Sequence, residues 1–172
     1  MWHDTHKRES DLDLRRAEVE QTKKDLHEMR NMRNASDGTK NVFVITLYIN
    51  PRPWTSPKVT RRGTYSAHSL TKKAMQVMLK GAYTGPLISS PIICDITFYM
   101  PIPPSMPKYL KERALKGLLR PDTKPDRTNL AKLAEDALEG IVLDNDKRIV
   151  GGNVEKLYGA EPKIVYLIEM LL

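Results

Sequence analysis

Cysteine is almost absent from this sequence of 172 residues, and aromatic residues make up only 6% of it. Because Cys94 is the only cysteine, it has no partner for an intrachain disulfide or a cysteine-based zinc site. No run of apolar residues approaches the roughly 20 that cross a bilayer. The first twenty residues are densely charged, which is unlike a secretory signal. We therefore expect a cytoplasmic protein with no membrane span, in which Cys94 is a small core residue.

Positive charge is present in excess, and it is unevenly distributed. The formal net charge is +7, from 28 Lys and Arg against 21 Asp and Glu. Residues 41–172 contain nineteen basic and twelve acidic side chains, so that portion accounts for the whole excess. A positive globular portion suits a polyanionic partner, because each Lys or Arg set against a phosphate releases counterions. Many soluble proteins are basic without binding nucleic acid. Charge alone therefore leaves two interpretations open, a nucleic-acid partner or a basic protein with no such partner.

Residues 1–40 are expected to form a charged helical extension followed by a linker, outside the core domain. Leu12, Val19 and Leu26 recur at a spacing of seven, which can seed a short coiled coil. Arg15 and Thr22 stand where the other half of that apolar seam would be. The pattern therefore favours an exposed, partly frayed helix with many ion pairs over a coiled coil.

Residues 41–172 alternate between strand-like and helix-like patterns. A β-branched run at 42–49 predicts a strand, a basic loop follows at 53–65, and a helix is expected from about Ser69. In that helix Leu70, Ala74, Val77 and Met78 are predicted to share the apolar face. A second strand is expected at 91–100, and a short basic amphipathic helix begins at 108.

The second half of this portion completes the predicted fold. A helix is expected over about 128–139, ending at Gly140, with a buried face made of Leu130, Leu133, Ala134, Ala137 and Leu138. Two strands, 149–158 and 163–170, are predicted to form a hairpin. The order β-α-β-α-β-β indicates an α+β fold, a mixed four-stranded sheet with helices packed on it.

Acidic residues lie on both sides of the helix expected at 128–139. Asp126 precedes it, Lys132 and Asp136 share its polar face, and Asp146 follows it. The loop after the helix is long enough to turn back, so Asp126 and Asp146 can face one site. Convergent carboxylates are what Mg²⁺ requires, and a nearby Lys stabilises charge on a phosphate. The alternative is that Asp126 caps the helix and residues 144–146 form a surface turn.

The motif as a whole resembles a known family. Lys124-Pro-Asp-Arg-Thr-Asn-Leu-Ala-Lys132, then Asp136-Ala-Leu-Glu-Gly-Ile, then an acidic residue before a β-branched one, is similar in order and spacing to the RusA family of Holliday-junction resolvases. The resemblance covers about residues 41–172. It implies a structure-selective endodeoxyribonuclease that acts on branched DNA, at four-way junctions, as a homodimer. It also implies Mg²⁺ held by three aspartates, with a supporting lysine.

The resemblance transfers roles to individual residues of this chain. It implies Asp126 and Asp146 as metal ligands and, together with Lys132, as catalytic residues. Thr128 departs from the pattern, because the family usually has its second aspartate there, and a hydroxyl binds Mg²⁺ more weakly. Glu135 lies two helical turns on from Thr128, about 10 Å along the axis, and is a candidate for an indirect compensating role.

Basic residues around the acidic motif are the expected DNA contacts. A structure-selective nuclease is the leading interpretation. One rival is a catalytically weakened or inactive junction-binding protein of the same fold, and another is a basic scaffold whose first forty residues recruit a partner. For Trp54 and Tyr65 two roles remain possible from the sequence, stacking on unpaired DNA bases or ordinary packing within the protein. The residues expected to hold DNA phosphates are Lys58, Arg61, Arg62, Lys72 and Lys73.

Overall fold

The computed structural model describes residues 42–171 except 57, 61–62 and 66–67, and for 58–60 and 63–65 it describes the backbone alone. The helical extension expected at residues 1–40 lies outside the described residues, as do Arg61 and Arg62. Within the described ranges no helix is both long and apolar enough to cross a membrane.

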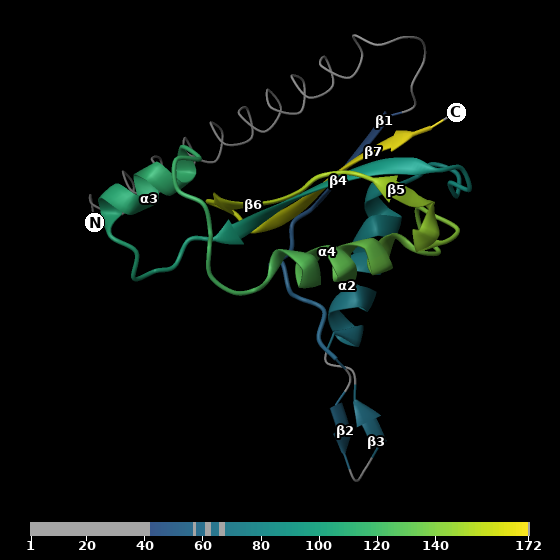
Figure 1. Ribbon diagram of the computed structural model, residues 1–172, viewed down its shortest axis with the longest axis horizontal. Helices are drawn as coiled ribbons and strands as arrows, with labels where there is room; N and C mark the ends of the chain where they lie inside the picture. Colours follow the sequence, from purple (N-terminus) through teal and green to yellow (C-terminus); the bar gives the residue numbers. More distant parts are fainter. Residues whose placement is uncertain (1–41, 57, 61–62, 66–67, 172) are drawn as a thin grey trace, which may run out of the picture.

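A mixed sheet of five strands forms the centre of the fold (Figure 1). Its four longer strands are β1 (Val42–Leu47), β4 (Ile92–Pro101), β6 (Val154–Gly159) and β7 (Lys163–Met170), and β5 (Ile149–Gly151) is short. The order is β1-β7-β4, with β5 and β6 both beside β4. β7 is antiparallel to β1 and β4, whereas β5 and β6 are parallel to β4. The predicted α+β class and mixed sheet are confirmed, but the sheet has five strands and not four, because the strand expected at 149–158 is divided into β5 and β6.

Two helices cover one face of this sheet. They are α2 (Ser69–Ala82) and α4 (Arg127–Leu138), which lie on the same side in Figure 1. The strand β4 alternates buried and half-buried residues, as expected of a strand with one face on the core. Ile164, Tyr166 and Ile168 of β7 point into the same core. The Tyr166 hydroxyl donates a hydrogen bond of 3.2 Å to the Ala134 carbonyl, which ties β7 to α4.

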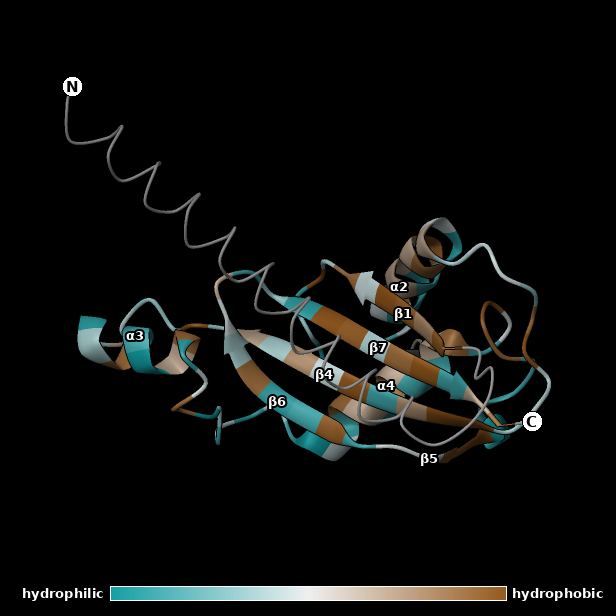
Figure 2. Ribbon diagram, turned by 90° about the horizontal axis from the view of Figure 1, so that it is seen from above, coloured by the Kyte–Doolittle hydropathy of each residue, from teal (hydrophilic) through white to brown (hydrophobic). Residues whose placement is uncertain are grey.

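The remaining elements project from this body. The strands β2 (Lys58–Thr60) and β3 (Gly63–Tyr65) form a small separate hairpin within the predicted basic loop. The helix α3 (Lys108–Leu115) stands at the far end of the sheet, beyond the ends of β4 and β6 (Figure 2). A short 3₁₀ turn, η1 (Asp146–Arg148), links α4 to β5.

The helix α4 forms as its sequence predicts. Gly140 has a φ of +75°, the left-handed conformation of a C-terminal cap. The exposed Asp126 and Thr128 lie at its N-terminal end, away from the core. All the apolar residues predicted for its core face are buried, namely Leu130, Leu133, Ala134, Ala137 and Leu138.

The predicted apolar face of α2 is wrong. Leu70 and Val77 are 67% and 71% exposed, whereas Met75 and Leu79 are buried. Apolar residues occur on two stripes of this helix, and the stripe with the long Met and Leu side chains fills the space between β1 and α4. Lys72, one of the expected DNA contacts, is half-buried, which its aliphatic stem permits.

The predicted hairpin of the last two strands is also wrong. β6 and β7 do not pair, because both pair with β4, one on each side of it. The link of residues 160–162 passes beyond the end of β4 at Pro101. The predicted strand 149–158 is moreover interrupted at Gly152 and Asn153. There the Asn153 N–H donates to the Asp95 carboxylate at 2.8 Å, and the Asn153 carbonyl accepts from Ile96 N–H.

Candidate active site and strand groove

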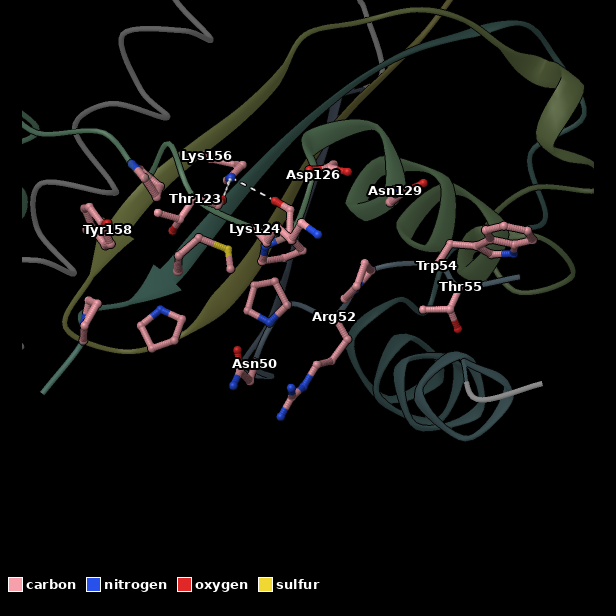
Figure 3. A pocket seen from close by; sticks show the side chains of 17 residues that line it. Asn50, Arg52, Trp54, Thr55, Thr123, Lys124, Asp126, Asn129, Lys156 and Tyr158 are labelled. Carbon is pink, nitrogen blue, oxygen red and sulfur yellow. Dashed lines mark hydrogen bonds between the residues drawn. The ribbon is translucent and has the colours of Figure 1, made fainter. Parts of the chain in front are cut away.

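A groove of about 580 Å³ opens where α4 begins (Figure 3). One wall is the segment that follows β1, and the opposite wall comes from the ends of β4 and β6 and from the segment before α4. We call it the strand groove, defined by its seventeen lining residues: Asn50, Pro51, Arg52, Pro53, Trp54, Thr55, Met100, Pro101, Pro103, Pro121, Thr123, Lys124, Pro125, Asp126, Asn129, Lys156 and Tyr158.

Asp126 stands at the rim of the strand groove, at the N-cap position of α4. Its backbone is extended (φ −68°, ψ 139°), and its side chain makes no capping hydrogen bond. The side chain is exposed. The alternative that Asp126 merely caps the helix is therefore wrong, since its carboxylate does not bind the amides of the first turn.

Two basic residues fix the chain on either side of Asp126. Lys156 Nζ donates to the carbonyls of Thr123 at 2.8 Å and Pro125 at 2.9 Å. On the other flank, an Arg127 guanidinium N–H donates to the Val154 carbonyl at 3.2 Å. Both sets of bonds tie the start of α4 to β6. The sequence motif gave no sign of Lys156, which comes thirty residues after Asp126.

Lys132 lies one and a half turns into α4 and is held by an aromatic side chain. Its Nζ is 3.8 Å from the centroid of the Trp54 ring, a cation–π contact. The Trp54 backbone N–H donates to the Asn129 carbonyl at 2.7 Å, which fixes the indole beside α4. The His68 ring packs against the same indole at 5.3 Å between centroids. The structure thus places Trp54 in packing contact with Lys132 and His68.

In the segment 144–146 after α4, two side chains make hydrogen bonds within the protein and the third is exposed to solvent. Asp144 accepts two hydrogen bonds of 2.8 Å from Arg148, which hold the pKa of its carboxyl below the usual value. Asn145 accepts from the Lys147 N–H and donates to the Glu139 carboxylate at 3.1 Å. Asp146 is exposed at the start of η1.

Glu135 is the acid that the structure brings near Asp146. It is half-buried on α4. Burial raises the pKa of the Glu135 carboxyl first, and the neighbouring carboxylates of Asp136 and Asp146 raise it further. Glu135 on α4 and Asp146 on η1 therefore lie near enough for their charges to repel each other.

Asp126 directly precedes α4, and Asp146 follows it at the start of η1. Asp126 lies nine residues before Glu135, which is about 13 Å along a helix axis at 1.5 Å per residue. That the carboxylates of Asp126 and Asp146 converge on one ion stays a prediction. Within the described ranges there is no group of three or more His, Cys, Asp or Glu side chains that could hold a metal ion. Mg²⁺ is commonly held by one or two carboxylates, with waters and phosphate oxygens completing its shell, and the acids here fit that mode of binding.

The expected DNA contacts are only partly described. Lys73 is exposed and Lys72 half-buried in the first turns of α2. Of Lys58 the structure describes only the backbone, in β2. Arg52 and Lys124, which the sequence did not single out as DNA contacts, are exposed cations that line the strand groove.

The chain is similar in sequence to a known protein family and to a curated bacterial protein. The profile of the family described as "Endodeoxyribonuclease RusA" matches residues 49–169. A curated protein of Bacillus subtilis (strain 168), "Uncharacterized protein YqaN", is 40% identical over 84 residues. That alignment covers 48% of this chain and 59% of the length of the Bacillus protein, so the chain spans less than two thirds of this relative.

Proposed function

Because the chain belongs to the RusA family of endodeoxyribonucleases, we propose that it resolves Holliday junctions by hydrolysing one phosphodiester bond in each of two DNA strands. The observation that carries the proposal is the position of Asp126. Its carboxylate does not cap α4 but stands at the rim of a cationic groove. Lys132, held against Trp54, comes from the same helix. An acid and a fixed cation beside a phosphate-binding surface are the parts that phosphodiester hydrolysis needs.

In the hydrolysis itself, a bond forms between a water oxygen and phosphorus, and the bond from phosphorus to one sugar oxygen breaks. The attacking water loses one proton, and the leaving sugar oxygen takes one up, so that a phosphate monoester and a free hydroxyl result. Lys132 stabilises the negative charge that builds on the phosphate oxygens in between. The Trp54 contact restricts the rotamers of Lys132, so its ammonium is in place before the charge develops.

Divalent metal dependence is part of the proposal, with Asp126 and Asp146 as the residues that hold Mg²⁺. Bound there, Mg²⁺ would supply a more acidic water and neutralise phosphate charge. Glu135 lies near Asp146, and the repulsion between the two carboxylates, which raises the pKa of Glu135, would be relieved by a cation bound there. Thr128 is exposed near the start of α4 and contributes no carboxylate.

The substrate in this proposal is a four-way junction bound by a homodimer. The basic residues Lys58, Arg61, Arg62, Lys72 and Lys73 would hold phosphates on the DNA arms. Size-exclusion chromatography with light scattering tests the dimer, which should have twice the mass of one chain.

One experiment tests the activity. The protein is incubated with an end-labelled synthetic four-way junction, in Mg²⁺ or in EDTA. Nicking is expected in Mg²⁺ alone, and Asp126→Asn should abolish it while leaving junction binding intact. Asp122→Asn, which neutralises another exposed acid of the segment before α4, is the matched control and should cut normally. Wild-type protein that nicks no junction at any Mg²⁺ concentration, or an Asp126→Asn variant that still cuts, would overturn the proposal.

A second candidate function is a junction-binding protein that has lost catalysis. The observation in its favour is that the described residues contain no cluster of three acids, where the family pattern implies three aspartates. Such a protein would bind the junction in EDTA and in Mg²⁺ alike, without nicking it.

A further inference from the structure

We infer that the strand groove binds a short stretch of a single DNA strand, about one or two unstacked nucleotides, and leads it to Asp126. DNA as the ligand rests on the proposed function. The existence of a cationic, apolar-walled groove does not, because it is a property of the structure (Figure 3).

The charge of the groove fits a phosphate chain. Its cationic lining residues are Arg52, Lys124 and Lys156, and among the described residues that line it Asp126 is the only acid. Lys156 is occupied by two backbone carbonyls. Arg52 and Lys124 are exposed, and within the described part of the chain neither makes an ion pair or a side-chain hydrogen bond. A guanidinium and an ammonium in this state can each take a phosphate.

The walls of the groove fit sugars and bases. Six of the seventeen lining residues are prolines, and Met100 and Tyr158 add further apolar surface. Proline rings present flat, rigid apolar faces and lose little conformational freedom when a ligand packs on them. Tyr158 is half-buried, and its ring can stack on a base, a contact that tolerates any sequence.

The size of the groove selects a single strand over a duplex. Its volume of about 580 Å³ is that of a site for a small organic molecule. A duplex would have to present both strands with their stacked bases, which such a cavity does not accommodate. At the crossover of a four-way junction, by contrast, a strand leaves one duplex arm and enters another, so its backbone is accessible.

The position of the groove connects this strand to the candidate centre. Asp126 and Asn129, from the start of α4, are lining residues, and so is Trp54, which holds Lys132. A strand whose phosphates sit on Arg52 and Lys124 therefore continues directly onto Asp126.

The test measures binding of a five-nucleotide oligothymidylate in EDTA, so that it does not depend on metal or cleavage. The chain has two tryptophans, and Trp2→Phe leaves Trp54, inside the groove, as the only indole reporter. In that background the oligonucleotide should change the fluorescence of Trp54. Arg52→Ala/Lys124→Ala should weaken binding about tenfold and reduce the salt slope by about 1.4, or about 0.7 for each lost contact with a single strand.

The matched control removes two exposed lysines outside the groove, as Lys80→Ala/Lys116→Ala. It loses the same charge and should bind the oligonucleotide as the wild type does. A DNA hairpin whose stem is long enough to stay fully paired in the assay should bind the two double variants with nearly equal affinity. If the control loses as much affinity as the groove variant, or the hairpin loses as much as the single strand, binding is unspecific attraction and the inference is overturned.

Failure of the inference and of the proposed function can be told apart. If the protein nicks junctions but the oligonucleotide binds equally well to wild type and groove variant, the inference fails and the nuclease stands. If binding depends on the groove but no junction is nicked, the nuclease fails and the groove remains a single-strand site. Circular dichroism melts of both double variants show that a lost affinity is not lost folding.

Discussion

Lys132 and Trp54 meet across two segments of the fold, with Nζ 3.8 Å from the centroid of the indole. Trp54 is fixed twice, through its backbone N–H to the Asn129 carbonyl and through its ring against that of His68, the N-cap residue of α2. The orientation of a lysine in the middle of α4 is therefore set by a residue in the segment after β1. This contact makes Trp54 a positioning residue for Lys132.

The first prediction follows from that contact. Trp54→Ala should lower the single-turnover rate of junction cleavage by about two- to fivefold, since Lys132 is exposed and a cation–π contact at an exposed site contributes about 0.5–1 kcal/mol. Trp54→Phe keeps an aromatic face and should restore most of the rate. Both rates are measured with enzyme in excess, so that weaker binding does not enter. If the Phe variant is as slow as the Ala variant, the ring does not act through Lys132.

A second prediction concerns the break between β5 and β6. Gly152 has a φ of +143°, and a Cβ there would overlap the carbonyl oxygen of Cys94. Gly152→Ala should lower the free energy of unfolding by roughly 1–3 kcal/mol, measured from urea midpoints. Gly151→Ala is the control at the preceding residue, where a Cβ meets nothing in the described structure within 4 Å. Equal midpoints for the two variants would contradict the clash.

A third prediction concerns the thiol of Cys94. Burial, with smaller contributions from Glu135 and Asp95, raises the pKa of this thiol to about 12. Because the thiolate is the reactive form, the folded protein should not react with a disulfide reagent at about pH 8. Concentrated guanidinium should release the single thiol of the chain. A native protein that reacts as fast as a free thiol would show that Cys94 is not in the core.

Local patterns predicted the elements well and their partners less well. The buried face of α4 was predicted because its apolar residues occupy one stripe, whereas α2 has apolar residues on two stripes and only the packing against β1 selects between them. The hairpin was predicted because strands close in sequence usually pair. Here β4 separates them, and nothing local in β6 or β7 records that β4 is the common neighbour.

In the candidate site, too, local sequence predicted some residues, whereas others depend on contacts between distant segments. Asp126, Lys132 and Asp146 lie within one motif of the sequence, so the sequence alone was enough to propose them. Trp54 and Lys156 act from positions far away in the sequence, one on Lys132 and the other on the segment before Asp126. Contacts of this kind depend on where the sheet places the segment after β1 and the strand β6. No spacing rule contains that information.

A fourth prediction uses the half-buried carboxyl of Glu135. Burial raises its pKa, and so do Asp136 and Asp146, so the folded state binds this proton more tightly than the unfolded chain does. The resulting stabilisation is complete below the unfolded pKa, about 4.3 for Glu, and is lost as the pH rises through the folded pKa. Glu135→Gln should therefore have the same free energy of unfolding as the wild type at acid pH. Above the folded pKa of Glu135, the variant should be the more stable of the two.

Urea unfolding from about pH 4 to pH 8 measures this difference. Glu112→Gln removes an exposed carboxyl of α3 and serves as the control. If Glu135 supports a bound ion, Mg²⁺ should stabilise the wild type more than Glu135→Gln at neutral pH. Stability curves that run parallel for wild type and Glu135→Gln would contradict the raised pKa.

The last prediction concerns Thr128, which separates an active nuclease from an inactive binder. Thr128 is exposed near the start of α4, whose first turn contains no acid. Thr128→Asp should lower the Mg²⁺ concentration needed for half-maximal junction cleavage, because it adds a carboxylate to the proposed metal ligands. It should also stabilise α4 by about 0.3–1 kcal/mol, since a negative charge near a helix N-terminus is favourable. Thr123→Asp places a carboxylate in the groove wall outside the helix, and it should weaken DNA binding without changing the Mg²⁺ requirement. An unchanged requirement in Thr128→Asp would remove this position from the metal site. Cleavage by Thr128→Asp alone, with none by the wild type, would instead identify the natural protein as the binder.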